Sequence, residues 1–186
     1  MSPRLAEPFT LEYALLGFLR DEPLHGYEIH QRLQSAGELS HVWRIKQAHL
    51  YALLGKLEAA GLIAGELLPQ DARPPRRILH LTDAGLAAFE EWVQTSVQHG
   101  RDLRLEFLAK LFWAQRLGDD RPGALIEAQR MAGEQWLAEL RRTAEGMDEN
   151  RRYEWLVIQF RVSQTTAMLH WLDTCEEVLL GPVTSQ

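Results

Sequence analysis

The feature that most restricts the fold of this chain is a single change of hydrophobic period near Gly61. Before it, apolar residues recur every three or four positions in three successive segments, a spacing that predicts amphipathic helices. After it, residues 62–68 and 76–81 have the pattern of two short strands, joined by a polar, proline-rich turn at 69–75. A lone two-stranded ribbon is marginally stable in water, so this ribbon must pack against the helices. Three helices followed by such a ribbon is the element order of a winged helix-turn-helix domain.

We expect the three helices to begin near Thr10, Gly26 and Lys46, with Thr10 as a side-chain N-cap. The second would end at Gly37 and the third at Gly61, because glycine readily adopts the left-handed conformation that ends a helix. The stretch through Trp43 is expected to be a loop. The apolar residues predicted on the inner faces are Leu11, Ala14, Leu15, Phe18 and Leu19 in the first helix, Tyr27, Ile29 and Leu33 in the second, and Leu50, Leu53, Leu54 and Leu57 in the third.

More helices are predicted after the ribbon. Thr82 would cap one whose inner face includes Leu86 and Phe89, and three others would cover residues 103–117, 122–146 and 150–180. The last would be about 45 Å long, too long for the winged domain alone to cover. Its apolar seam predicts packing along another helix, in part from a second copy of the chain. The seam residues are Tyr153, Leu156, Phe160, Ala167, Trp171, Cys175 and Val178.

These patterns predict a mainly α-helical protein with a small β-ribbon, divided into a winged helix-turn-helix domain at residues 1–98 and a helical dimerisation domain at 99–186. The single cysteine excludes an internal disulfide. No stretch has the length and apolar character of a membrane span or the pattern of a signal peptide, so we expect a cytoplasmic protein.

The distribution of charge matters more than its sum. The chain carries a net charge of −6, which taken alone argues against nucleic-acid binding. Residues 41–80 nevertheless contain six Lys and Arg against three Asp and Glu, a local charge of +3. One basic segment therefore lies inside an acidic protein, and it includes the third helix and the ribbon.

The outer face of the third helix is unusually slim. With the four leucines buried, the opposite side is a strip of small residues, Ala48, Ala52, Gly55 and Ala59. Gly55 costs about 1 kcal/mol of helix stability relative to alanine, so the strip needs an explanation. A helix inserted into the DNA major groove requires such a face. The alternative is that alanine is simply a good helix former and that the strip is accidental.

Side chains around this strip and on the ribbon have the chemistry of DNA contacts. Gln47 and His49 suit base edges, and Lys46, Tyr51 and Lys56 suit phosphates. Arginines at the ribbon suit a wing that grips the backbone or minor groove, although a basic surface hairpin is more often merely solvated. The predicted DNA-binding residues are Lys46, Gln47, His49, Tyr51, Lys56, Arg73, Arg76, Arg77 and Tyr27.

Four segments together resemble the PadR family of transcriptional regulators: residues 25–29 (HGYEI), 50–63 (LYALLGKLEAAGLI), 73–77 (RPPRR) and 81–85 (LTDAG). The resemblance implies a homodimeric winged-helix repressor that binds an inverted-repeat operator in double-stranded DNA. It implies that Tyr51 contacts DNA and that a small aromatic or hydrophobic effector releases the operator. Lys46 stands where the family usually has a serine cap, which weakens the start of the third helix.

Other features of the sequence have ordinary explanations. Four tryptophans lie in the C-terminal helices: Trp113, Trp136, Trp155 and Trp171. Their usual role there is packing in the core and the dimer interface. The alternative is that these four form an aromatic effector cage at the dimer interface. The histidines lack metal-ligand spacing, and no nucleophile or phosphate-loop motif is present. We therefore expect no enzyme activity, cofactor or metal. The alternative function is a winged-helix protein-interaction module that does not bind DNA.

Overall fold

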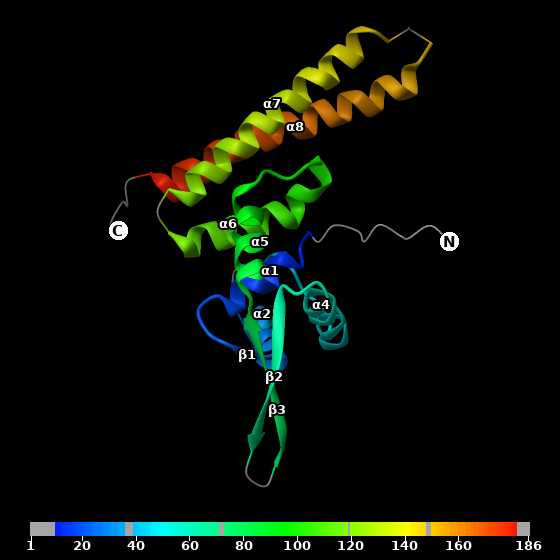
Figure 1. The fold of residues 1–186 in the computed structure, drawn as a ribbon. Helices are drawn as coiled ribbons and strands as arrows, with labels where there is room; N and C mark the ends of the chain where they lie inside the picture. The colour runs from blue at the N-terminus through cyan, green and yellow to red at the C-terminus, as the bar shows by residue number, and fades with distance from the viewer. Residues whose placement is uncertain (1–9, 36–38, 71–72, 119, 148–149, 182–186) are drawn as a thin grey trace. The chain divides into compact units, whose positions relative to one another are not determined.

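The structure is a computed structural model, and it describes residues 10–35, 39–70, 73–118, 120–147 and 150–181 (Figure 1). The chain divides into two compact units. The first comprises Met1–Val93 with Leu103–Trp113, and the second comprises Gln94–Asp102 with Ala114–Gln186. The predicted fold class, mainly helical with a small β-ribbon, is confirmed.

The first unit begins with short helices. Helix α1 (Tyr13–Leu16) continues as a 3₁₀ turn, η1 (Gly17–Leu19), followed by α2 (Gly26–Ser35), α3 (Leu39–Val42) and α4 (Gln47–Ala59). Two predictions were wrong here. Thr10 does not cap the first helix, because α1 begins after Glu12, which makes no side-chain cap bond. The expected loop before α4 contains α3, whose Leu39 is buried and anchors it. Gly37 lies outside the described residues.

The inner faces of these helices agree with the periodicity except at two positions. The four leucines of α4 are buried, and so are Ile29 and Leu33 of α2. Tyr27 is 47% exposed, so its predicted burial was wrong. Residues two apart in an α-helix are about 200° apart around the axis, so Tyr27 and Ile29 cannot share the buried face. Leu11 is only half-buried because it precedes the helix.

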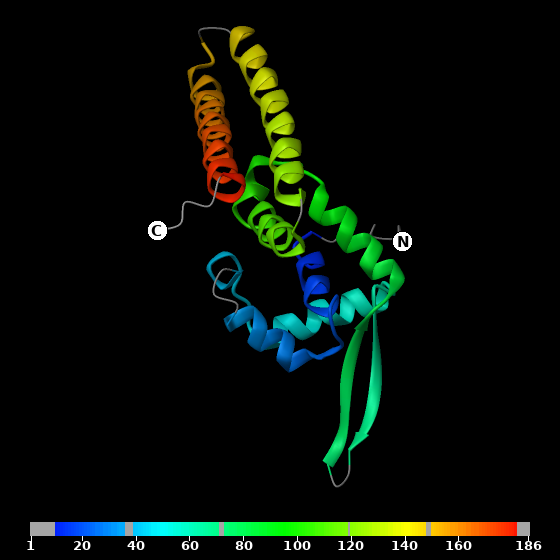
Figure 2. The same cartoon turned by 90° about the vertical axis from the view of Figure 1, so that its left-hand side faces the viewer.

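The wing is formed by β2 (Ile63–Gln70) and β3 (Arg73–Leu81), and β1 (Leu24–His25) pairs with the other edge of β3. All neighbours are antiparallel, in the order β1-β3-β2. The strands extend farther than predicted, so the expected 69–75 turn is largely strand, with an irregularity between Leu68 and Gln70. In Figures 1 and 2 the distal half of the wing projects beyond the helices of its own unit.

The first unit closes around an aromatic core. Helix α5 (Asp83–Gln94) is capped as predicted, since the Thr82 hydroxyl accepts the Gly85 N–H at 3.0 Å. Phe89 of α5 and Phe18 pack edge-on against Trp113 of α6 (Glu106–Leu117), with ring centroids 5.7 and 5.0 Å away. Leu86 is partly exposed rather than inward-facing.

The second unit is built on two long antiparallel helices, α7 (Arg121–Glu145) and α8 (Arg152–Leu180), with a 3₁₀ segment, η2 (Gly100–Arg104), at its boundary (Figure 2). Gly133 of α7 lies directly against Met168 of α8. Arg130 joins the two helices through ion pairs with Asp173 and Glu176. None of the helices in the described ranges is both long enough and apolar enough to span a membrane.

Candidate nucleic-acid interface

The small-residue strip of α4 is open to water. Ala48, Ala52, Gly55 and Ala59 are all exposed. A Cβ built on Gly55 would meet nothing within 4 Å. The amphipathic arrangement predicted for this helix is therefore confirmed, and within the first unit no described side chain fills the space above Gly55.

Polar and cationic side chains border the strip. Lys46, Gln47, His49 and Lys56 are exposed, and their side chains form no hydrogen bond or ion pair with other described residues. Lys46 occupies the N-cap position of α4 in extended conformation without a side-chain cap bond. The start of α4 therefore keeps unsatisfied backbone N–H groups, and its partial positive charge favours an anion.

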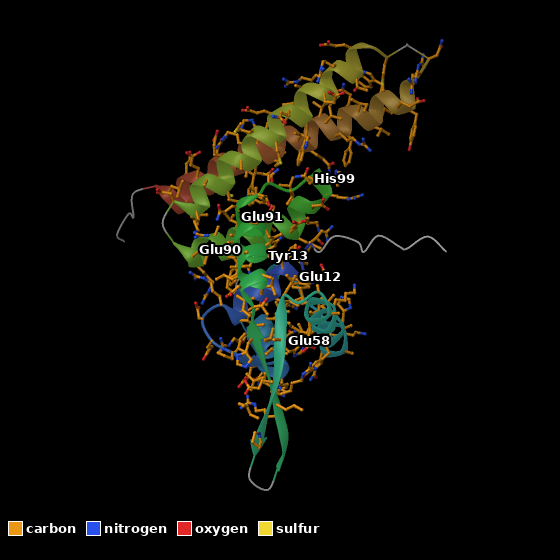
Figure 3. All side chains as sticks on the ribbon, in the orientation of Figure 1. Glu12, Tyr13, Glu58, Glu90, Glu91 and His99 are labelled. Atoms are coloured by element: carbon orange, nitrogen blue, oxygen red, sulfur yellow. The ribbon has the colours of Figure 1, made fainter. Side chains whose placement is uncertain are left out.

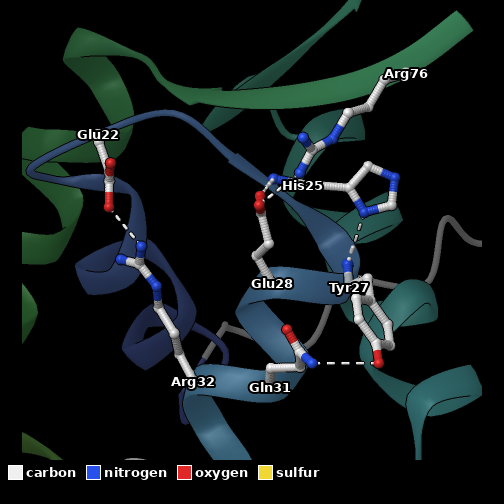
Figure 4. A network of polar contacts seen from close by, with 7 residues as sticks. All are labelled: Glu22, His25, Tyr27, Glu28, Gln31, Arg32 and Arg76. Atoms are coloured by element: carbon white, nitrogen blue, oxygen red, sulfur yellow. Dashed lines mark hydrogen bonds and ion pairs between the residues drawn. The ribbon is translucent and has the colours of Figure 1, made fainter.

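Two tyrosines form the junction between α2 and α4. Tyr51, 43% exposed, lies so close to Gly26 that a Cβ there would stand 2.7 Å from its ring. The Tyr27 hydroxyl accepts a hydrogen bond from Gln31 at 3.2 Å (Figure 4). Tyr27 and Tyr51 are thus two partly exposed tyrosines on neighbouring helices. Gly26 allows Tyr51 to approach α2, because it has no side chain in the way.

Two of the wing arginines, Arg76 and Arg77, are not free cations. Arg76 pairs with Glu28 in the first turn of α2 (Figure 4). Arg77 pairs with Glu58, which lies near the end of α4 and is labelled in Figure 3. The His25 N–H donates to the second oxygen of Glu28 at 2.8 Å. This backbone hydrogen bond and then Arg76 lower the pKa of Glu28 below its ordinary value. The side chain of Arg73 lies outside the described part, although its backbone begins β3.

Sequence reasoning placed the arginines on the wing but missed their carboxylate partners. The sequence does show that both carboxylates lie near helix ends, with Glu28 in the first turn of its helix and Glu58 one turn before Gly61. Nothing local indicated that these positions meet β3, since 48 residues separate Glu28 from Arg76 and 19 separate Glu58 from Arg77.

The four tryptophans of the hypothetical effector cage are not brought together in one protomer. Trp113 is buried in the first unit, and its indole N–H has no acceptor among the described residues. Trp136, Trp155 and Trp171 belong to the second unit. Trp155 and Trp171 are sixteen residues apart on α8, a rise of about 24 Å.

The described residues contain neither a metal-binding cluster nor a reactive thiol. No group of three or more His, Cys, Asp or Glu side chains there is arranged to hold a metal ion. Cys175 is buried, and burial raises the pKa of its thiol to about 11, which keeps it protonated and unreactive near neutral pH.

Comparison with known proteins agrees with the motifs. Residues 15–91 match the model of the transcriptional regulator PadR-like family, and residues 103–179 match that of the virulence activator alpha C-terminal domain. The negative transcriptional regulator PadR of Bacillus subtilis (strain 168) is 28% identical over 120 residues, which cover 64% of this chain and 65% of that protein. The match therefore spans just under two thirds of that relative's length.

Solved structures similar to this chain include PadR of Bacillus subtilis in complex with operator DNA, at 23% identity and a TM-score of 0.45, covering 91% of this chain and 98% of that one. The same protein in complex with p-coumaric acid matches at 23% identity and a TM-score of 0.41, with the same coverage of 91% and 98%. A PadR-like transcriptional regulator from Bacillus cereus is 31% identical, with a TM-score of 0.37 and coverage of 44% and 75%. On the family match and the motifs that it contains, the chain belongs to the PadR-like family of transcriptional regulators.

Proposed function

We propose that this protein is a homodimeric transcriptional repressor that binds an inverted-repeat operator through α4 and the wing, and that it acts without catalysis. The open small-residue strip of α4, bordered by unpaired polar side chains, is the observation that carries the proposal. Such a helix reaches base edges because its outer face leaves room in the major groove. The curated relative's description as a negative regulator supports repression rather than activation.

The contacts divide by chemistry. Ala48 and Ala52 would touch thymine methyl groups, and Gln47 and His49 would hydrogen-bond to base edges. Lys46, Tyr51 and Lys56, together with Tyr27 of α2, would position the helix through phosphates. The wing, which carries Arg73, Arg76 and Arg77, would follow the backbone of the adjacent groove, with Arg73 as its phosphate contact.

A second copy supplies the symmetry that an inverted repeat requires. Most of the α8 seam is left uncovered by the described residues: Tyr153 is 76% exposed and Phe160 is 61% exposed, and Leu156 and Val178 are exposed too, whereas Cys175 is buried. An apolar face of this kind on a long helix supports pairing with another helix. In this proposal residues 1–98 bind DNA and residues 99–186 dimerise. The two α4 helices then enter successive major grooves about 34 Å apart.

Regulation by a small aromatic or hydrophobic effector is part of the proposal. The indole N–H of Trp113 supports effector regulation, because this buried hydrogen-bond donor has no acceptor among the described residues. Buried donors are normally paired, so an effector could supply the missing acceptor. Since Trp155 and Trp171 lie about 24 Å apart along α8, a cage that includes both would need both copies. Effector binding should quench tryptophan fluorescence and release the operator together; quenching without release would separate the pocket from regulation.

Selection of bound oligonucleotides from a random pool tests the function. A palindromic consensus is expected, followed by titration of its affinity over a range of salt concentrations. If each protomer neutralises four or five phosphates, the slope of log K against log salt would be about −7 to −9.

Ala52→Leu should abolish selective binding, whereas Ala87→Leu, the same change on an exposed position of α5, should not. Absence of a consensus with a flat salt response would instead favour a protein-interaction module.

A further inference from the structure

The wing is tied to the helices on both of its faces. Arg76 and Arg77 are consecutive in β3, so their side chains leave opposite faces of the ribbon. Their β2 partners in the register are Leu68 and Leu67, which places both arginines in the paired part of the wing. One arginine reaches α2 and the other reaches α4. The ribbon is therefore held between two helices of the same unit.

The junction with α4 is a three-way contact. Arg77 Nη2 lies 2.5 Å from both carboxylate oxygens of Glu58. Glu58 Oε1 also accepts the N–H of Gly65 in β2, at 3.1 Å. A Cβ on Gly65 would stand 2.6 Å from Arg77 Nε and 2.8 Å from Glu58 Oε1, so glycine makes room for the pair. Glu58 thus joins the last turn of α4 to both strands.

The junction with α2 is also anchored twice. Glu28 accepts from Arg76 with one oxygen and from the His25 N–H with the other. His25 ends β1, which pairs with β3 at Ile78. One carboxylate therefore links the first turn of α2, the edge strand and the wing (Figure 4).

We propose that Glu28 and Glu58 are positioning residues for DNA binding, which brace the wing against α2 and α4, and that Arg76 and Arg77 act through these carboxylates rather than as phosphate ligands. The inference rests on the proposed function and deepens it. With the wing braced, its distance and angle to the small-residue strip are set before DNA arrives. Preorganisation of this kind reduces the conformational entropy lost on binding.

The brace has an electrostatic consequence that separates it from phosphate binding. Each pair is close to neutral, so it releases few counterions when DNA binds. A phosphate ligand contributes about 0.9 to the salt slope per protomer, hence about 1.8 per dimer. Lys46 and Lys56, whose side chains are unpaired among the described residues, should carry such contributions, whereas Arg76 and Arg77 should not.

The test compares alanine and glutamine at the same carboxylate. Glu58→Ala removes the charge and every hydrogen bond, whereas Glu58→Gln removes the charge but keeps an acceptor for Gly65. We expect Glu58→Ala to weaken operator binding by up to about fivefold per protomer, the upper range for a partly exposed pair, and hence by up to about 25-fold for the dimer. Glu58→Gln should recover part of the loss. Arg77→Ala should match Glu58→Ala, and the double variant should lose no more than either alone. The same comparison applies to Glu28 and Arg76.

Controls come from the same unit. Glu22→Ala removes a carboxylate whose partner is Arg32, away from the wing, and should leave operator binding within twofold. Lys56→Ala should reduce the magnitude of the salt slope by about 1.8, whereas Arg77→Ala should leave it unchanged. Equal tightening of binding in Glu58→Ala and Glu58→Gln, or a reduced slope in Arg77→Ala, would overturn the brace.

A measurement without DNA completes the test. In the free protein, Glu58→Ala should speed hydrogen exchange of the Gly65 amide several-fold, and Glu22→Ala should not. Unchanged exchange at Gly65 would show that the carboxylate does not hold the ribbon. If the wild-type protein selects no DNA at all, the proposed function fails while the exchange result still reports on the junction itself.

Discussion

Substitution of Gly55 separates the stability of α4 from its ability to enter DNA. The backbone at Gly55 is helical, and an added Cβ would meet nothing within 4 Å. Gly55→Ala should therefore raise the free energy of unfolding by about 1 kcal/mol, the difference in helix propensity between glycine and alanine. Gly55→Leu should raise it by nearly as much, because the side chain points into water in the free protein.

The two variants should differ when DNA is added. Leucine would fill the space that the slim face leaves for base edges, and overpacking of this kind costs about 1–3 kcal/mol, or roughly 5- to 150-fold in affinity. Gly55→Ala adds one methyl group and should cost much less. Urea denaturation followed by circular dichroism gives the stability, and fluorescence anisotropy with the selected operator gives the affinity.

The expected result is a variant that is more stable than the wild type and binds DNA worse. Wild-type affinity in a stably folded Gly55→Leu protein would refute the insertion of this face into the groove. A loss of stability in both variants would refute the conclusion that the space around Gly55 is empty in the folded protein. Each half of the reasoning is thus tested by a separate measurement.

Four further predictions follow from the described contacts. Gln47→Ala should change base preference at one operator position by roughly 1–3 kcal/mol, measured on a panel of singly substituted operators; uniform weakening on all of them would assign Gln47 to phosphate instead. Gly85→Ala should lower the free energy of unfolding by about 3 kcal/mol in urea, because a Cβ there would overlap the carbonyl oxygen of Leu62. Because the pKa of Glu28 is lowered in the folded protein, its stabilisation is present above the ordinary carboxyl pKa and is lost as pH falls through the folded value. The difference in unfolding free energy between wild type and Glu28→Gln should therefore shrink as the pH is lowered below about 5, and a constant difference would contradict the paired carboxylate. Phe160→Asp should convert the dimer to monomers in analytical ultracentrifugation, since its exposed ring lies on the α8 seam; an unchanged dimer would place the interface elsewhere.

Local patterns were sufficient for the elements that depend on a single amphipathic face. Helix α4 begins and ends within a residue or two of its predicted limits, and its leucines are buried, because four apolar side chains on one side define its orientation. Gly61 adopts a positive φ of 73°, as expected for a residue that ends a helix. The Thr82 cap was visible for the same reason, because a cap is made within one turn.

Contacts between distant segments were beyond the sequence patterns. The wrongly predicted burial of Tyr27 is not of this kind, because helix geometry alone places Tyr27 away from the face that Ile29 and Leu33 share. Trp113 belongs to the aromatic core of the first unit, although it lies in the C-terminal half, because α6 packs beside Phe18 and Phe89. Periodicity states that a side chain is buried but not against which element.

The sequence by itself therefore determined the order of the elements, the slim face of α4 and the family, since these depend on residues close together along the chain. Only the tertiary structure decided which charges remain free at the proposed DNA surface. The wing arginines and the α4 lysines look alike in sequence, yet Arg76 and Arg77 meet carboxylates while Lys46 and Lys56 do not. The physical reason is that an ion pair requires two groups within about 4 Å, and that proximity is set by strand register and helix packing.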